Sequence, residues 1–182
     1  MRSIKTSELA FATALLVLLT FAGCSTSSGV VRNASPISTS KLVSLDFVLV
    51  ETSSSLGDVG SEKRLLKDSI ILNLRETGFF GSVSGNKADG NSGSGIKISA
   101  EIKEVQKVSD HARLWMGGLA GRARIVVQVT VTDLNSRNQI EKFEAEGESG
   151  KSADAGTTDE AIQRAAEQVV AQIVEIRSQA SQ

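Results

Sequence analysis

Apolar residues occupy every second position in three stretches of this chain, which is the pattern of strands that bury one face. These stretches are Ile96 to Ile102, Ile125 to Val131 and, less regularly, Phe143 to Gly147. Val105 and Val108 continue the first stretch in a shifted phase, which indicates a β-bulge near Glu104. The short polar segment from Leu134 to Asn138 favours a hairpin between the strands on either side.

Two further stretches predict strands on other grounds. Val43 to Val50 is apolar at both odd and even positions, as expected for a central strand that is covered on both faces. Phe79 to Val83 is a short, mainly apolar stretch that fits a brief strand. The chain therefore contains five predicted strands.

Helical periodicity marks a segment between the first two of these strands. Leu66, Ile70 and Leu74 recur every four residues, so they share one face of a helix. Ser61 is predicted to cap its N-terminus, and Gly78 lies where a helix end favours a left-handed residue.

A second helix is predicted near the end of the chain. Thr157 and Glu160 form the S/T-x-x-E capping box that begins many helices. The residues behind this box place one apolar face along the helix: Ile162, Ala166, Val169, Ile173 and Ile176.

The order of elements is strand, helix, four strands, helix, which predicts an α+β fold. The simplest arrangement is a single mixed, mostly antiparallel sheet with two helices on one face. We expect residues 1–23 to be a signal peptide, 24–41 a flexible Ser/Thr-rich tether, 42–177 a single α/β domain and 178–182 a disordered tail. The tether has few large apolar residues, so it cannot bury enough surface to offset its ordering entropy. The alternative is that this stretch contains a first strand that folds into the domain.

The overall composition limits the chemistry and partners of this domain. The formal net charge is −1, which gives no basic surface for nucleic acid. One cysteine and one histidine, His111, do not supply the ligands of a zinc site. We expect no metal and no cofactor.

The only cysteine, Cys24, lies at the end of a secretory signal. Arg2 and Lys5 precede an apolar run of about thirteen residues, which is shorter than the roughly 20 that a membrane-spanning helix needs. Phe21-Ala22-Gly23-Cys24 resembles the lipobox of bacterial lipoproteins, although Phe21 stands where leucine is usual. The alternative is an ordinary secreted protein with a single unpaired thiol.

The lipobox resemblance implies a modified cysteine. In such lipoproteins the signal is removed before the cysteine, whose sulfur carries diacylglycerol and whose new amino group carries an acyl chain such as palmitate. Several acyl chains hold a protein on a membrane far longer than one. Ser25 stands where an aspartate would mark retention at the inner membrane, so the resemblance implies the periplasmic face of the outer membrane.

A glycine-rich segment between two predicted strands is the most unusual part of the domain. A nucleotide-binding loop would need a helix after the glycines, and here a strand follows. The segment is therefore either a plain strand connection or a contact loop for protein or lipid, because it holds large apolar side chains. Its candidate contact residues are Arg113, Trp115, Met116, Gly117, Gly118, Leu119, Gly121 and Arg122.

Other candidate sites lack a required residue. The nearest match to a nucleophile elbow has Val83 where serine is needed, so His111 has no triad to join. The Asp89 to Gly95 segment resembles a calcium loop, but Ala100 replaces its bidentate acid. Glutamates at 101, 104, 144 and 146 are interpreted as the solvent face of alternating strands.

The run from Ile96 to Gly147 resembles an uncharacterised group of bacterial lipoproteins, the domain of unknown function family 4410 (DUF4410). The shared features are a strand, an arginine (Arg113), a glycine-rich turn and a long apolar strand that ends in Asp133. Where that family commonly has glycine after the aspartate, this chain has Leu134-Asn135-Ser136. The resemblance implies location and fold, because the family brings no established activity.

These features predict a non-enzymatic lipoprotein of the outer membrane. We expect it to act as a binding or scaffold module of an envelope assembly, with the membrane and another envelope protein as partners and neither nucleic acid nor nucleotide. One alternative is an envelope hydrolase of cell-wall glycan, which needs two converging carboxylates. Another is a small-ligand carrier lipoprotein, which needs an apolar cavity of about 300 Å³ or more.

Overall fold

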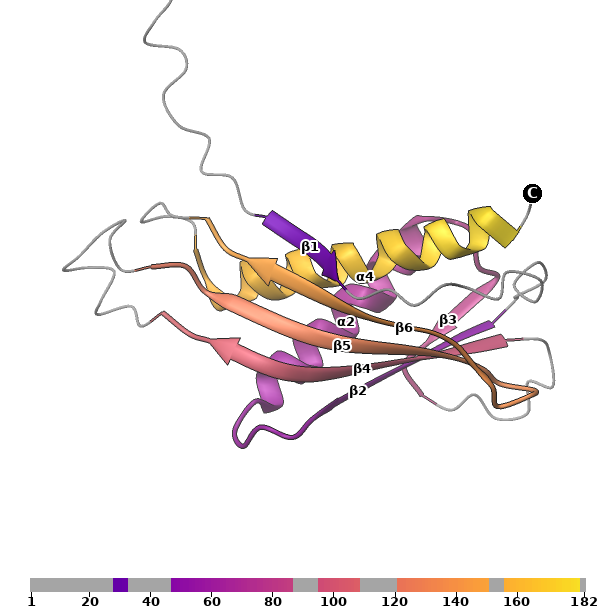
Figure 1. The fold of residues 1–182 in the computed structure, drawn as a ribbon, viewed down its shortest axis with the longest axis horizontal. Coiled ribbons are helices and arrows are strands. Elements are labelled where there is room, and N and C mark those ends of the chain that lie inside the picture. The colour runs from indigo at the N-terminus through magenta and orange to yellow at the C-terminus, as the bar shows by residue number, and fades with distance from the viewer. Residues whose placement is uncertain (1–27, 33–46, 87–94, 109–120, 151–155, 181–182) are drawn as a thin grey trace, which may run out of the picture.

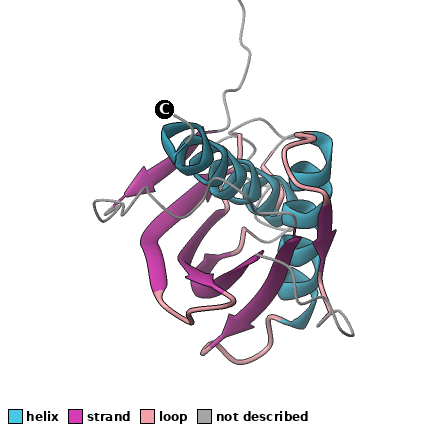
Figure 2. Cartoon of the chain, turned by 90° about the vertical axis from the view of Figure 1, so that its right-hand side faces the viewer, coloured by secondary structure: helices cyan, strands magenta, loops and turns pink. Residues whose placement is uncertain are grey.

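Six strands form one open sheet, and two helices cover one of its faces (Figures 1 and 2). The computed structural model describes residues 28–32, 47–86, 95–108, 121–150 and 156–180. In chain order the elements are β1 (Ser28–Arg32), β2 (Phe47–Ser54), α2 (Gly60–Glu76), β3 (Ser82–Ser84), β4 (Gly95–Gln106), β5 (Arg124–Asp133), β6 (Gln139–Glu148) and α4 (Thr158–Ala180). The strand order across the sheet is β1-β6-β5-β4-β2-β3.

The sheet is mixed, as the sequence predicts. β4 and β5, β5 and β6, and β6 and β1 pair antiparallel, whereas β2 runs parallel to both β3 and β4. α2 and α4 contact each other and lie on the same side of the sheet (Figure 2). The predicted α+β class is confirmed.

The sheet has one strand more than the sequence predicts, because β1 lies within the segment predicted as a tether. Its five residues pair antiparallel with β6, from Ser28 opposite Glu148 to Arg32 opposite Glu144. The pairing satisfies backbone groups on the outer edge of β6. Val31 also packs against the core. Residues 28–32 are thus part of the folded domain, and the rest of the predicted tether lies outside the described residues.

The two ends of α2 differ in how well the sequence predicts them. The helix begins at Gly60 without a side-chain cap, so the prediction that Ser61 is the N-cap is wrong. Ser61 Oγ instead donates a hydrogen bond to the Glu62 carboxylate at 3.0 Å. The predicted end is confirmed, because Gly78 has a φ of +66° and its N–H donates to the Arg75 carbonyl.

The predicted irregularities of the strands are also present. The register of β4 against β5 shifts between Ile102 and Glu104, which confirms the bulge. The β5–β6 hairpin is closed by hydrogen bonds from Asp133 N to Asn138 O and from Arg137 N to Asp133 O, both 2.9 Å. The short strand expected at Phe79–Val83 lies instead at Ser82–Ser84.

The core lies between the sheet and the two helices. Alternate residues of β2, β4, β5 and β6 point into it and are almost completely buried, as are the apolar faces of both helices. The opposite face of the sheet carries mainly polar residues, among them Glu51, Lys97, Ser99, Gln128 and Thr130. α4 extends to Ala180, so the tail predicted from residue 178 is helical at its start.

α4 packs against the backbone of β6 at Gly147. A Cβ atom at Gly147 would overlap the Ala161 carbonyl oxygen and would lie 2.6 Å from the Ala165 backbone nitrogen. Both contacts are backbone atoms inside a helix, so they cannot move aside individually. The close approach therefore requires glycine in the strand and small residues in the helix.

We expect Gly147→Ala to lower the free energy of unfolding by about 1–3 kcal/mol, the usual effect of overpacking a core. Gly57→Ala is the matched control, because Gly57 is exposed and a Cβ there has nothing within 4 Å. Urea denaturation of both variants measures the difference. Equal midpoints for Gly147→Ala and the parent chain would show that α4 does not pack this closely.

Candidate functional site

Four neighbouring strands reach the same end of the sheet, at the point where the glycine-rich segment joins it. The register places Ser28 opposite Glu148, Glu148 opposite Arg124, and Arg124 opposite Gln106. The structure describes the chain up to Val108 and again from residue 121, and most of the glycine-rich segment lies between these two points. We call this end of the sheet the loop end.

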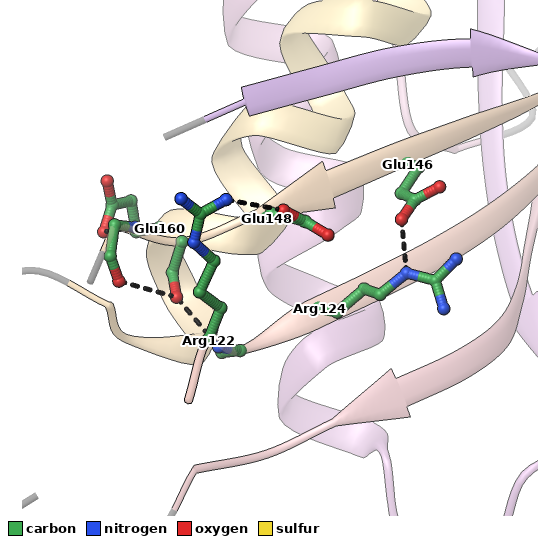
Figure 3. A network of polar contacts seen from close by, with 8 residues as sticks. Arg122, Arg124, Glu146, Glu148 and Glu160 are labelled. Carbon is green, nitrogen blue, oxygen red and sulfur yellow. Dashed lines mark hydrogen bonds and ion pairs between the residues drawn. The ribbon is translucent and has the colours of Figure 1, made fainter. Parts of the chain in front are cut away.

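Arginine and glutamate side chains pair across the strands of the loop end (Figure 3). Arg122 Nη1 donates to Glu148 Oε2 at 2.9 Å. Arg124 Nε donates to Glu146 Oε1, and its Nη1 lies 3.3 Å from Glu104 Oε1. The bond with Glu146 raises the pKa of the Arg124 guanidinium. Arg124 thereby links β4, β5 and β6.

The return of the glycine-rich segment into β5 is fixed by backbone contacts. Gly121 has a φ of +90°, which favours glycine. The Ala123 N–H then donates to the buried Ser149 hydroxyl at 2.9 Å, and the Ser149 N–H donates to the Ala123 carbonyl at 2.9 Å. This reciprocal pair sets where the segment enters the sheet.

Glu160, in the first turn of α4, holds the connection between β6 and that helix (Figure 3). Its Oε2 accepts hydrogen bonds from the backbone N–H groups of Gly150, at 3.2 Å, and Gly156, at 2.7 Å. The Glu160 N–H donates to Thr157 Oγ1 at 3.0 Å. The predicted capping box is thus half formed, because the Glu160 carboxylate binds the preceding loop.

An ion pair between Lys107 and Glu62 connects the end of β4 to the start of α2. Burial of Glu62 would raise its pKa, but the hydrogen bonds from Lys107, its own backbone and Ser61 outweigh that effect and lower the pKa. The same hydrogen bond raises the pKa of Lys107. Both groups therefore stay charged at neutral pH.

The structure describes two of the predicted site residues, Gly121 and Arg122, and places both at the loop end. Cys24 and the other candidates (Arg113, Trp115, Met116, Gly117, Gly118 and Leu119) lie outside the described residues. The role of the glycine-rich segment as a contact loop stays a prediction. The interpretation of Glu146 as a solvent-facing residue is wrong, because it is only 4% exposed and paired with Arg124.

A groove of about 570 Å³ lies at the opposite end of the sheet, on the face that the helices leave open. It is lined by Leu49, Glu51, Lys97, Thr132, Asp133, Leu134 and Arg137. Lys97 Nζ lies 3.6 Å from Glu51 Oε2. Asp133 Oδ1 accepts hydrogen bonds from the backbone N–H groups of Asn135 and Ser136. The two acids that line the groove thus already have partners.

Sequence reasoning missed a buried acid on the helix-covered face. Glu141 on β6 is 1% exposed, and its Oε1 accepts a hydrogen bond from Gln172 of α4 at 3.2 Å. Its Oε2 has no hydrogen-bond partner among the described residues. Burial raises the pKa of the Glu141 carboxyl above its ordinary value. In the sequence, Glu141 falls on the same alternating face of β6 as Phe143 and Ala145, and this spacing was the available sign that it is buried.

The described part of the chain contains neither a metal-binding cluster nor a membrane-spanning helix. No three His, Cys, Asp or Glu residues in it are grouped so as to hold a metal ion. None of its helices is long and apolar enough to cross a membrane.

Comparison with known proteins identifies the fold alone. No family model and no curated protein matches the chain. The PelC dodecamer from Paraburkholderia phytofirmans matches with a TM-score of 0.51 and 13% identity, over 82% of this chain and 96% of that one. Protein XCC0632 from Xanthomonas campestris, described by the family model DUF330, matches with a TM-score of 0.43 and 12% identity, over 82% and 95%.

We expect Glu141→Gln to stabilise the protein at neutral pH. Because the folded-state pKa of Glu141 is raised, the unfolded chain releases this proton first, from about pH 4.5 upward. The free energy of unfolding therefore falls as pH rises between the two pKa values and stays lower above them. Glutamine does not ionise, so the variant keeps this part of the free energy of unfolding. We expect it to be more stable than the parent at pH 7 by on the order of 1 kcal/mol.

Thermal unfolding at pH 7 and at about pH 4 tests this expectation. The melting temperature of Glu141→Gln should exceed that of the parent at pH 7, and the gap should close near pH 4, where the carboxyl is protonated in both states. Glu144→Gln is the control, because Glu144 lies on the same strand but points to the opposite face. A gap that is the same at both pH values would contradict a raised pKa.

Proposed function

We propose that this chain is a lipoprotein of the outer membrane that faces the periplasm and is anchored through acylated Cys24. In this proposal it is a non-enzymatic binding or scaffold module of an envelope assembly. The signal-like leader, the lipobox resemblance and the resemblance to the DUF4410 lipoproteins support it. Its partners are the membrane and an envelope protein.

The position of β1 carries the scaffold part of the proposal. β1 begins at Ser28, four residues after Cys24. Four residues span at most about 14 Å, so an anchored domain would stay at the membrane surface. A domain that searches for distant partners would need a long tether. A short connection suits a module that holds a fixed position in an assembly.

The fold match gives a reason to extend this proposal to self-assembly. The PelC chain of similar fold forms a dodecamer. We include self-association of this chain in the proposed scaffold role. The glycine-rich segment, with Trp115, Met116 and Leu119, is the proposed contact loop within it.

The two alternative functions depend on the groove. A glycan hydrolase would use Glu51 and Asp133, the acids that line it, but both already bind other groups of this chain. A carrier would use its volume of about 570 Å³, which exceeds the minimum for a small ligand. The charged lining, however, differs from the apolar cavity that a lipid-like ligand needs.

We expect Cys24→Ala to move the protein from the membrane fraction to the soluble fraction, because several buried acyl chains would be lost. Cell fractionation and intact-mass measurement check this. The parent chain should begin at Cys24 and carry the mass of a diacylglycerol and an acyl chain. A processed parent chain with a free thiol would contradict the lipoprotein proposal.

Crosslinking in intact cells tests the scaffold role itself. We expect crosslinked species that contain several copies of this chain or another envelope protein, and Trp115→Ala should reduce them without changing the melting temperature. Leu72→Ala is the control, because Leu72 is an exposed apolar residue on α2, away from the loop end. A purely monomeric parent chain would remove the scaffold role and leave the carrier and hydrolase alternatives.

A further inference from the structure

The short distance between Cys24 and β1 limits how the domain can lie on a membrane. This inference rests on the lipid anchor of the proposed function. Ser28, four residues from Cys24, belongs to the loop end, and the register aligns it there with Glu148, Arg124 and Gln106. Neighbouring strands are about 4.8 Å apart, so this row extends only about 14 Å sideways from Ser28.

The starts of both helices lie at the same end. α4 begins directly after the loop that follows β6, and Glu160 ties that loop to its first turn. The start of α2 is held by the Lys107–Glu62 pair to the residue after β4. The turn between β2 and α2 carries Leu56, one of the exposed large apolar residues. The loop end is therefore a surface built from several elements (Figure 1).

Most charged side chains of strands β4 to β6 that the structure describes at the loop end are paired with one another. Its described ion pairs are Lys107 with Glu62, Arg122 with Glu148, and Arg124 with Glu104 and Glu146. Among the described residues of this end Asp58 and Asp159 are exposed acids, so these residues carry no excess of positive charge that would attract anionic lipid. Contact with a lipid surface would therefore depend on the anchor and on apolar side chains, and only weakly on salt.

We propose that the loop end lies against the lipid surface. The sheet then stands away from the membrane, because the strands run from the loop end toward the β5–β6 turn. β5 has ten residues, so its far end lies about 30 Å further out. The groove lined by Glu51, Lys97 and Arg137 is at that far end and faces the periplasm, where a partner can reach it.

Site-specific fluorescence in vesicles tests this orientation. The acylated sulfur of Cys24 does not react with thiol labels, so an introduced cysteine is the only labelled position. Leu56→Cys and Asp159→Cys place a fluorophore at the loop end, and Asn135→Cys places it in the exposed β5–β6 turn. The purified acylated variants are incorporated into phosphatidylethanolamine–phosphatidylglycerol vesicles that contain a lipid with a nitroxide at the headgroup.

We expect the nitroxide to quench the labels at 56 and 159 at least about twofold more than the label at 135, because about 30 Å separates the two ends. The difference should persist when salt is raised. Val30→Cys, at an exposed residue of the outermost strand β1, reports on the alternative in which the sheet edge lies on the membrane.

The outcomes separate this inference from the proposed function. Equal quenching at 56, 159 and 135, or the strongest quenching at 30, overturns the orientation while the protein still floats with the vesicles. Failure of the acylated parent chain to float with vesicles overturns the lipid anchor and the orientation with it. Circular dichroism of each labelled variant confirms that the fold is intact.

Discussion

The close contact between α4 and β6 is the constraint on which the rest of the structure depends. Gly147 allows the backbone of α4 to lie directly on the strand, and Ala161 and Ala165 keep the helix side of the contact equally small. This places α4 across β6 and its neighbours, so one helix covers the core under β5, β6 and β1. A larger residue at this contact would lift the helix and expose the apolar residues beneath it.

The same contact explains why the sheet accepts a sixth strand. Gly29 on β1 is opposite Gly147, and Gln168 of α4 fills the space that a side chain at Gly29 would occupy. β1 thus adds to the edge of β6 beneath a helix that already lies close. Its addition shortens the connection to Cys24 from the whole predicted tether to a few residues. Core packing and the distance to the proposed anchor are therefore linked through one strand.

Sequence patterns predicted the elements whose burial follows a simple period. The alternation in β4, β5 and β6 was visible because one face of each strand is buried, and the bulge near Glu104 was visible as a change of phase. β1 was predicted only as the alternative to a tether, because its five residues lie in a Ser-rich context and are stabilised by a partner more than 100 residues away. The capping role of Ser61 was wrong because its hydroxyl binds Glu62.

The candidate site was less predictable than the fold, because its groups come together only through register. The pairs Arg122–Glu148 and Arg124–Glu146 join residues more than 20 positions apart, and no local spacing marks them. In each pair the arginine neutralises an acid on β6. These charge-assisted hydrogen bonds are buried or half-buried. The groove keeps a charged lining with Lys97 and Arg137. The two ends therefore differ: the described charges of the loop end are mostly paired across strands, whereas the groove presents charged side chains at its open surface.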